Sequence, residues 1–423
     1  MVSEVKLLQP RLRFVDFHDD WTQQRIGSIL TDISRPVQLL DNELYQLVTV
    51  KRRNEGVVPR SVVKGKNILV KNYFAIKAGD FLISKRQVVH GANGIVPESL
   101  DNAVVSNEYL VVTDNQKITA KFWSTISKRP EIKKLYFISS YGVDIEKLVF
   151  DITDWKERYI LIPELNEQQK ITDFFQNLDQ QIELHQDKHR KLQQLKKAML
   201  DKMFPRAGKK VPELRFAGFD SDWETKDFQE IFIYIRNNSL SRAELNDDAG
   251  LGMNVHYGDV LVKFGEILDF TLEKVPFITN GGAVEKMMPN RLQDGDIVFA
   301  DAAEDLTVGK CCEINKLGSQ PLFAGLHTIA VRPKKAFAPK YLGYFLNSNL
   351  YHDQLLTLIQ GTKVSSISKS SIKETQVYYP KDAAEQAKIG EYFHNLERLI
   401  VIQQQKINKL ENIKQACLGK MFV

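Results

Sequence analysis

Two stretches of the sequence repeat one another: KITDFFQNLDQQIELHQDKHRKLQQLKKAMLDKMF at residues 170–204 and KIGEYFHNLERLIVIQQQKINKLENIKQACLGKMF at residues 388–422. They align without gaps, and 16 of their 35 positions are identical. Average compositions would give about one match in fifteen. The chain therefore contains an internal duplication, and the duplication decides how the rest of the sequence is divided.

A second pair of matching stretches precedes the first. RLRFVDFHDDW at residues 11–21 reappears as ELRFAGFDSDW at residues 213–223, with Leu, Arg, Phe, Phe, Asp and Trp in register. Between the matching ends, residues 25–120 and 227–335 show little resemblance. Each half of about 210 residues is thus alike at its ends and different in its centre.

The repeated stretches have the apolar spacing of long helices with a coiled-coil seam, since apolar residues recur at alternating intervals of four and three. The first helix is predicted from about Glu167 to Met203, a length of roughly 55 Å at 1.5 Å per residue. So long a helix needs a partner, and each repeat is the obvious partner of the other. The seam residues are Ile171, Phe175, Leu178, Ile182, Leu192 and Met199 in the first helix and Ile389, Phe393, Leu396, Ile400, Ile407 and Leu410 in the second.

The charges along the helices favour antiparallel pairing. Residues 164–187 are rich in acids and residues 188–210 are rich in bases, and the second helix is skewed the same way, less strongly. Antiparallel pairing sets each acidic start beside a basic end, although the skew also complements the dipole of each helix by itself. Phe204-Pro-Arg-Ala-Gly-Lys-Lys-Val-Pro212 provides a turn between the halves.

The divergent parts are predicted to be rich in short strands. QLVTV, KNILVKNYFAI, GDFLIS and EYLVV in the first half, and NVHYGDVLV, GDIVFA and HTIAVRP in the second, alternate apolar and polar residues near Gly-Asp turns. Each part ends in an amphipathic helix, FWSTISKRPEIKKLYFISSYG or YLGYFLNSNLYHDQLLTLIQG. The predicted class is α+β: two strand-rich units separated by two long helices in an antiparallel coiled coil, with internal pseudo-twofold symmetry. The predicted segments are a globular unit at 1–160, a helix at 161–205, a globular unit at 206–378 and a helix at 379–423.

Composition and absent motifs weigh against an enzyme. The 423 residues hold 58 Lys+Arg and 53 Asp+Glu, a net charge of +5 that permits a nucleic-acid partner without requiring one. There is no phosphate-binding loop, HExxH, GxSxG or dinucleotide-type glycine turn. Glu164, Glu167 and Lys170 resemble a nuclease acid-acid-lysine set, but they open a helix, where acids favour the dipole. We therefore predict no catalytic residue.

The sequence also gives little sign of metal, disulfide or membrane chemistry. His185 and His189 could bind a metal, but no carboxylate or thiol cluster joins them, so we interpret them as polar interruptions of the seam. Three cysteines, two of them adjacent at Cys311 and Cys312, make neither a disulfide framework nor a zinc motif, and burial is the favoured interpretation. No run of 18 apolar residues and no signal peptide is present, so a cytoplasmic protein without membrane contact is expected.

Two diverged units on duplicated helices suit contact with two segments of a long polymer, and double-stranded DNA fits best. Because the units differ in sequence, the two DNA segments should differ too. Phosphates need Lys, Arg and hydroxyl groups, whereas base edges favour Arg or Lys with guanine and Asn or Gln with adenine. The loop-placed candidates are Lys51, Arg52, Arg53, Arg60, Lys64, Lys85, Arg86, Gln87 and Asn93 in the first unit and Lys263, Asn280, Lys286, Asn290, Arg291, Lys310, Thr362, Lys363, Ser365 and Ser366 in the second. Any one of them could instead be an ordinary solvated side chain.

Several stretches together resemble the specificity (S) subunit of type I restriction-modification enzymes, the HsdS family. They are the repeated xLRFxxFxxxW motif, AGDFLIS, DGDIVFADAAED, GLHTIAVRPK and QGTKVSSISKSSIKETQVYYP. The resemblance covers essentially the whole chain. It implies two target recognition domains, each reading half of a split, asymmetric DNA site, and conserved spacer helices that set the gap between the halves.

The resemblance also implies partners and cofactors. Subunits of this family are not catalytic; they dock two methyltransferase (M) subunits that use S-adenosylmethionine and, in the full bacterial defence complex, ATP- and Mg²⁺-dependent restriction (R) subunits. No cofactor is expected in this chain. The lead into the first helix, ILIPELNEQQKI, is close to the family pattern, whereas YYPKDAAEQAKI has one extra residue and lacks the leucine. This departure puts M-subunit docking at that end in doubt.

Two alternatives differ in class. A fused restriction or methylation enzyme is disfavoured because the chain has neither an aminomethyltransferase tetrapeptide nor a nuclease motif. A coiled-coil protein with no DNA role is disfavoured because more than half of the chain is predicted to be globular and rich in strands.

Overall fold

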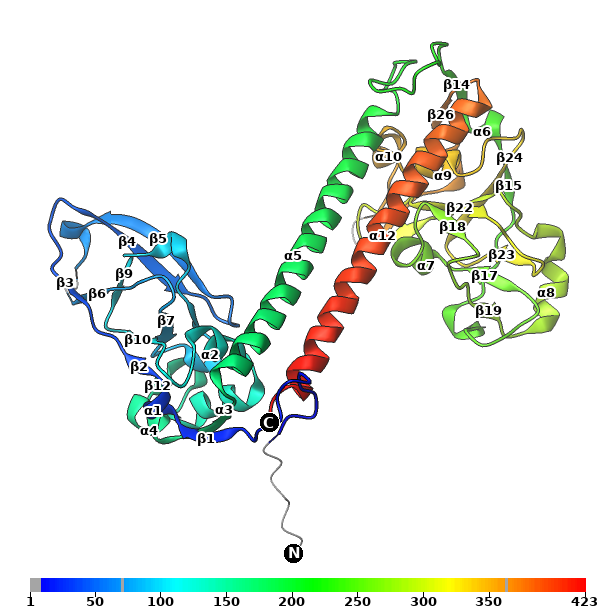
Figure 1. Ribbon diagram of the computed structural model, residues 1–423. Coiled ribbons are helices and arrows are strands. Elements are labelled where there is room, and N and C mark those ends of the chain that lie inside the picture. The colour runs from blue at the N-terminus through cyan, green and yellow to red at the C-terminus, as the bar shows by residue number, and fades with distance from the viewer. Residues whose placement is uncertain (1–8, 70–71, 362–363) are drawn as a thin grey trace, which may run out of the picture. The chain divides into compact units, whose positions relative to one another are not determined.

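The computed structural model describes residues 9–69, 72–361 and 364–423. The chain folds into two compact units, and each takes in part of both long helices. The first unit comprises Met1–His185 and Lys406–Val423, and the second comprises Gln186–Gln405. The long helices are α5 (Leu165–Lys202) and α12 (Ala383–Lys420), drawn in green and in orange to red in Figure 1.

The first unit has a five-stranded sheet in the order β3-β6-β9-β4-β5, a four-stranded sheet in the order β2-β10-β7-β8, and two-stranded pairs β1-β13 and β11-β12. The strands are β1 (Thr22–Arg25), β2 (Thr31–Asp32), β3 (Pro36–Val37), β4 (Leu44–Val50), β5 (Val57–Lys64), β6 (Tyr73–Ala75), β7 (Phe81–Ser84), β8 (Asn93–Ile95), β9 (Val104–Ser106), β10 (Tyr109–Thr113), β11 (Ser140–Tyr141), β12 (Val149–Phe150) and β13 (Tyr159–Ile162). The shorter helices are α1 (Ile26–Ile29), α2 (Ala120–Ile126), α3 (Pro130–Ile138) and α4 (Ile152–Glu157), with 3-10 turns η1 (Gly65–Asn67), η2 (Val88–His90), η3 (Glu98–Leu100) and η4 (Ile145–Lys147).

The second unit also has a five-stranded sheet, a four-stranded sheet and two strand pairs, with other strand orders. Its five-stranded sheet has the order β15-β24-β20-β22-β18, its four-stranded sheet the order β16-β19-β17-β23, and its pairs are β14-β26 and β21-β25. The strands are β14 (Glu224–Asp227), β15 (Phe232–Ile235), β16 (Leu245–Asn246), β17 (Met253–Val255), β18 (Ile267–Asp269), β19 (Phe277–Ile278), β20 (Ile297–Ala300), β21 (Ala302–Ala303), β22 (Cys311–Asn315), β23 (Leu322–Ala324), β24 (Thr328–Pro333), β25 (Ser365–Ser366) and β26 (Gln376–Tyr379). The helices are α6 (Phe228–Ile231), α7 (Tyr257–Val262), α8 (Gly281–Met287), α9 (Tyr341–Leu346), α10 (Asn349–Leu356) and α11 (Lys369–Ile372), with η5 (Arg242–Glu244) and η6 (Met288–Asn290).

The long helices run antiparallel within each unit, as the charge pattern predicts. In the first unit, Phe175 stacks on Phe422 and Asp179 pairs with Lys414, so the partner number falls as the α5 number rises. In the second unit, Lys196 pairs with Glu397 and Phe204 stacks on Phe393 in the same sense. The predicted seam residues are buried or half-buried along both helices, and His185 and His189 are half-buried seam positions.

Each unit has one core beside the long helices, to which the repeated residues contribute, and a second core built from divergent residues alone. In the first unit, the core beside the long helices contains Trp21, Ile171, Phe175 and Phe422, whereas a separate core lies between strands β4, β7, β9 and β10. The second unit has a similar core around Trp223, Phe204 and Phe393, and a separate one between β17, β20, β22 and β24. The repeated ends of the halves therefore pack on the long helices together with part of each divergent centre, and each divergent centre also forms a core of its own.

Each of the predicted Gly-Asp turns lies directly before a strand, one in each unit. Gly79 and Gly295 have φ of +89° and +85°, which glycine adopts without strain. The aspartates that follow are buried: Arg35 donates to Asp80 at 2.6 Å, and Arg332 donates to Asp296 at 2.7 Å. Strands β7 and β20 begin at the next residue in each unit.

Several predicted elements differ from the structure. KNILVKNYFAI is not one strand: its start lies in the 3-10 turn η1, and of its described residues only Tyr73–Ala75 form a strand, β6. NVHYGDVLV is not one strand: β17 ends at Val255, and residues 257–262 form α7, whose first turn is capped by the His256 side chain accepting from the Gly258 N–H. Each predicted amphipathic helix is a pair of short helices, α2 and α3 in the first unit and α9 and α10 in the second. Pro130 begins α3, and Ser348 precedes α10, so the chain turns where a continuous helix was expected.

Candidate DNA interface

The repeated Leu-Arg-Phe motif binds the start of α5 through its arginine. The Arg13 guanidinium donates to both carboxylate oxygens of Glu167 at 2.7 Å and to the Asp19 carbonyl at 2.6 Å. Glu167 is 1% exposed, so this bidentate pair fixes the motif on the helix. Glu167 was interpreted from the sequence only as a dipole-favouring acid; its structural role is to receive Arg13.

The same contacts recur in the second unit. Arg215 donates to both oxygens of Glu385 at 2.7 Å and to the Ser221 carbonyl at 2.8 Å. Trp223 meets Phe204 edge to face, as Trp21 meets Phe422 in the first unit. The altered lead into the second helix thus keeps the glutamate that binds the arginine of the repeated motif. The phenylalanine of each Lys-Met-Phe end packs on the tryptophan of a repeated motif.

The hairpin between β4 and β5 presents the first predicted cluster. Arg53 and Asn54 have φ of 60° and 59°, and the Glu55 N–H donates to the Arg52 carbonyl, as in the tight turns of twisted hairpins. The turn is held against the next segment, because the Arg53 N–H donates to the His90 carbonyl at 2.7 Å and the Asn54 N–H to Gly91 at 2.8 Å. The side chains of Lys51, Arg52 and Arg53 are exposed, and Arg52 pairs with Glu146 at 2.6 Å.

The second predicted cluster lies beside this turn, but its members differ in access. Arg86 is exposed and pairs with Glu108, while the Lys85 ammonium donates to the Asn107 carbonyl. Gln87 is half-buried. Asn93 is 3% exposed and accepts from the Asn54 side chain at 2.9 Å, so the prediction that Asn93 is a loop residue open to DNA is wrong.

Arg60 and Lys64 are not loop residues, contrary to expectation. Both lie in β5, the edge strand of the five-stranded sheet, and both are exposed. A short β-hairpin with cations on its open edge can still lie along a DNA backbone, as strand readers do.

The second unit uses some predicted contacts for its own folding. The Lys310 ammonium donates to the carbonyls of Leu261 and Phe264 at 2.9 Å, which closes the end of α7. Lys263 donates to the Lys274 carbonyl, and the Asn280 side chain caps α8 by accepting from the Gly282 N–H. Lys310 is therefore a structural cation rather than a free loop residue.

The remaining candidates of the second unit lie around α8 and β25. Lys286 is exposed on α8, Asn290 is half-buried in η6, and Arg291 follows it, exposed. Ser365 and Ser366 form β25 rather than a loop, pairing with Ala303 and Ala302 of β21. Thr362 and Lys363 lie outside the described residues.

A basic groove that the sequence did not suggest lies in the first unit. A hollow of about 590 Å³ is lined by cations from three elements: the hairpin turn, the turn into α3 and the end of α12. The five cations are Arg53, Lys128, Arg129, Lys133 and Lys414. Glu131 also lines it and pairs with Arg129 at 3.1 Å. The signal available in the sequence was SKRPEIKK, a run that was interpreted as an amphipathic helix.

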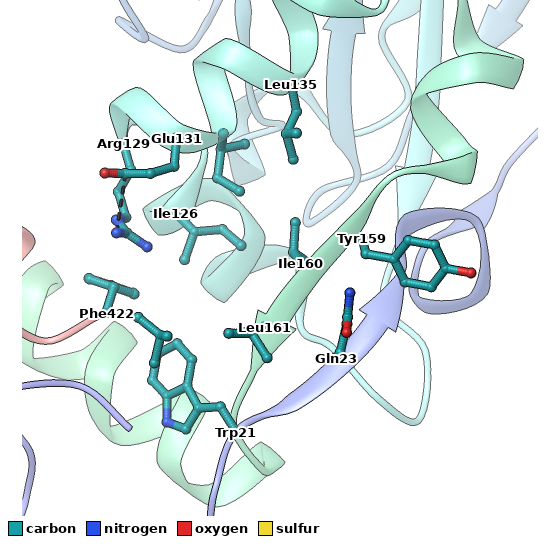
Figure 2. Close-up of a pocket in the computed structure, with 12 residues that line it drawn as sticks. Trp21, Gln23, Ile126, Arg129, Glu131, Leu135, Tyr159, Ile160, Leu161 and Phe422 are labelled. Carbon is teal, nitrogen blue, oxygen red and sulfur yellow. Dashed lines mark ion pairs between the residues drawn. The ribbon is translucent and has the colours of Figure 1, made fainter. Parts of the chain in front are cut away.

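Figure 2 shows a neighbouring, smaller hollow of about 240 Å³ with an apolar floor of Ile126, Ile160, Leu161 and Phe422. Its polar groups are Gln23, Tyr159 and the Arg129–Glu131 pair. No nucleophile lies beside a base among the residues drawn there, so the arrangement is not that of a hydrolytic or transfer site.

Other reactive side chains of the described segments are structural. Cys311 and Cys312 are buried in β22, and burial raises the pKa of the Cys312 thiol to about 12 and that of Cys311 well above its ordinary value. Both stay protonated and unreactive at neutral pH. Residues 9–69, 72–361 and 364–423 hold no group of three metal-ligating side chains. Within those ranges no helix is long and apolar enough to cross a membrane.

Comparisons with known proteins agree with this architecture. The family described as "Type I restriction modification DNA specificity domain" matches residues 18–194 and 220–412, one match for each half. The HindI specificity subunit of Haemophilus influenzae is 26% identical over 44% of this chain and 41% of its own length, less than half of that relative. The MjaVIII specificity subunit of Methanocaldococcus jannaschii is 20% identical over 96% of this chain and 92% of its own.

A solved S subunit of a type I restriction-modification system from M. genitalium has the same fold, with a TM-score of 0.58, 15% identity, and coverage of 98% of this chain and 99% of that one. The family match spans far more than half of the sequence and repeats in register with the duplication found above. The chain therefore belongs to the family described as type I restriction modification DNA specificity domain.

Proposed function

We propose that this chain is a non-catalytic subunit in which each unit reads one half of a bipartite, asymmetric DNA site. The observation that carries the proposal is the division of each unit into two cores. The core beside the long helices contains the repeated aromatic residues of both halves, whereas the second core is built from divergent residues alone, and the exposed cations of the predicted set lie in these divergent parts. A shared attachment with different reading surfaces is what a reader of two unlike half-sites needs.

The contacts with DNA are proposed at the exposed cations of the predicted set whose side chains donate to no main-chain carbonyl among the described residues. In the first unit these are Lys51, Arg52, Arg53, Arg60, Lys64 and Arg86, and in the second Lys286 and Arg291. They are cations on a hairpin, an edge strand and a helix end, where phosphate oxygens and guanine edges can reach them. Asn93 and Lys310 are left out because Asn93 is buried and the Lys310 ammonium donates to two main-chain carbonyls.

The long helices are proposed to set the distance between half-sites and to dock two methyltransferase subunits. Apolar side chains on their outer faces support docking: Leu399 and Val401 on α12 are 48% and 46% exposed, and Leu184 on α5 is also exposed. A helix face of this kind calls for a covering protein surface. The S-adenosylmethionine, ATP and Mg²⁺ of the reaction belong, in this proposal, to the methyltransferase and restriction subunits in the cytoplasm.

Footprinting of DNA by the chain with its methyltransferase subunits tests the proposal. Protection of two unequal patches separated by a fixed gap is the expected result, and protection without sequence preference would contradict it. A parallel assay measures transfer of labelled methyl groups to DNA by the purified chain alone. No transfer is expected, since no catalytic arrangement is found in the described residues; transfer would favour the fused-enzyme alternative.

A further inference from the structure

The two long helices exchange one ion pair at the same place in each unit. Asp179 of α5 pairs with Lys414 of α12 in the first unit, and Glu397 of α12 pairs with Lys196 of α5 in the second. Asp179 and Glu397 occupy equivalent positions in the duplicated stretches, and so do Lys196 and Lys414. The internal repeat therefore supplies an equivalent acid-base pair to both units.

A third side chain joins each pair from the globular part, and its charge differs between the units. In the second unit, Glu266 accepts from Lys196 at 2.8 Å, so one lysine lies between two carboxylates. In the first unit, the third group is Lys128, 3.9 Å from Asp179, so two lysines share one carboxylate. The second cluster carries a net charge of −1 and the first a net charge of +1.

The two clusters differ accordingly in how well their lysines are compensated. Burial lowers the pKa of Lys196, but Glu266 and Glu397 outweigh it and leave that pKa raised. Burial lowers the pKa of Lys128, Asp179 offsets this only in part, and Lys414 lowers it further. The first unit thus holds an excess cation where the second unit has closed the equivalent cluster with an acid.

The cluster with the excess cation faces the basic groove. Lys128 and Lys414 line it together with Arg53, Lys133 and Arg129. Of these, Arg129 is committed to Glu131 and lies over the Phe422 ring at 4.7 Å. Among the described residues, the side chains of Arg53 and Lys133 have no acidic partner. Ammonium and guanidinium groups from three elements therefore converge on one open space.

We propose that this groove binds a phosphate of the DNA backbone, supplied by the strand that meets the hairpin. The inference rests on the DNA specificity role of the chain. Arg53 belongs both to the groove and to the exposed hairpin turn, so a backbone lying on the hairpin continues into the groove. A phosphate supplies the negative charge that Glu266 supplies in the second unit.

This contact would be made by one unit only. It carries no sequence information, because a phosphate is the same at every step of the duplex, and it would position the first unit on its half-site. It would also bring a residue of a long helix, Lys414, into contact with DNA, whereas the candidates from the sequence lie only in the globular parts.

The salt dependence of DNA binding tests the proposal. The full-length chain with its methyltransferase subunits is titrated against a mixed-sequence duplex of about 40 base pairs between roughly 50 and 200 mM KCl, a range in which counterion release dominates. Lys128→Met, Lys133→Met and Lys414→Met are each expected to reduce the slope of log K against log salt by about 0.9. Lys133→Arg keeps the charge, so it should have the same slope as the parent chain. The matched control is Lys134→Met, next to Lys133 on α3 and outside the groove, which should leave the slope unchanged.

The outcomes separate this inference from the DNA role itself. Slopes unchanged in all three variants, with a reduced slope in Lys51→Met on the hairpin, would overturn the groove and leave DNA binding standing. If the slopes stay unchanged but the variants no longer bind the methyltransferase subunits, the groove binds an acidic protein surface. That result would also overturn the proposed phosphate contact. Thermal unfolding is measured alongside. Lys128→Met removes one of two like charges, so it should unfold no earlier than the parent chain.

Discussion

At the scale of single residues, charge in this protein is used mainly to hold segments in place. Arg13 and Arg215 each bind a buried glutamate with both arms of the guanidinium group. Breaking such a pair leaves a carboxylate in a dry site without its partner, which costs more than the pair contributes when intact. The repeated motifs are therefore attachment points rather than reading groups.

Arg215→Met tests this attachment. We expect a loss of about 3 kcal/mol in the free energy of unfolding, because Glu385 is 1% exposed and would stay charged without compensation. Urea-induced unfolding measures it. Arg215→Met combined with Glu385→Leu should recover part of the loss, since the uncompensated charge is gone. A single variant within about 0.5 kcal/mol of the parent, the range of ordinary surface changes, would refute the attachment.

Glu313 gives a prediction for pH dependence. It is buried and accepts from the backbone N–H groups of Lys340 and Gly343, yet burial raises its pKa to about 7. The folded pKa lies above the unfolded value of about 4.3, so the folded state binds more protons between these limits. Stability should therefore fall, by up to about 3 kcal/mol, as pH rises from about 4.5 to 7, and then level off.

Urea unfolding at pH 5 and pH 8 measures this slope, with Glu313→Gln as the comparison. The glutamine does not titrate, so the variant should lose this contribution to the pH difference whatever its absolute stability. An identical difference in both proteins would show that Glu313 is not responsible.

Residue chemistry alone could not separate contacts with DNA from contacts within the protein. Asn93 and Lys310 have the right groups for a base edge and a phosphate, but their partners are Asn54 and the end of α7. Those partners are distant in sequence, and only the fold brings them together. In contrast, the Arg13–Glu167 pair had a detectable signal, since Leu-Arg-Phe and Glu-Gln both recur in the two halves.

At the scale of elements, long periodic segments were predictable and short ones were not. The helix predicted from Glu167 to Met203 is observed from Leu165 to Lys202, because its seam repeats over many turns. NVHYGDVLV offers only nine residues, in which the apolar spacing fits a strand as well as a helix. The His256 cap and the burial of Val260 in the divergent core stabilise its second part as the helix α7.

The long helices carry the prediction for the spacer. Seven residues, one seam repeat, inserted after His185 in α5 and after Gln405 in α12, keep both seams in phase. At 1.5 Å per residue the insertion adds about 10 Å, or roughly three base pairs of DNA. We expect the gap in the recognised site to lengthen by about that amount while both half-sites stay the same.

Sequencing of methylated DNA from cells that carry the lengthened chain with its methyltransferase measures the gap. A four-residue insertion at the same two points serves as the control, because it rotates the seam and should weaken recognition rather than shift it. Changed bases within either half-site would contradict the spacer role of the helices.

At the scale of the whole molecule, the duplicated parts of the two halves make the same contacts with the long helices, and the divergent parts differ. The cores beside the long helices keep the same aromatic contacts in both units, Trp21 with Phe422 and Trp223 with Phe204. The outer sheets, which are the five-stranded sheet of the first unit and the four-stranded sheet of the second, share neither strand order nor sequence. A change in one outer sheet should therefore leave the attachment of that unit, and all of the other unit, as they were.

This independence predicts that each half of the DNA site can be relaxed separately. Replacing Lys51, Arg52 and Arg60 with serine should weaken discrimination in one half-site by about 1–3 kcal/mol for each base that loses its contact, with the other half-site read as before. Lys286→Ser with Arg291→Ser is the reciprocal control and should relax only the opposite half. Competition binding with duplexes mutated at single positions measures both. Loss of discrimination in both half-sites from either variant would contradict this independence. It would mean that the two units read DNA jointly.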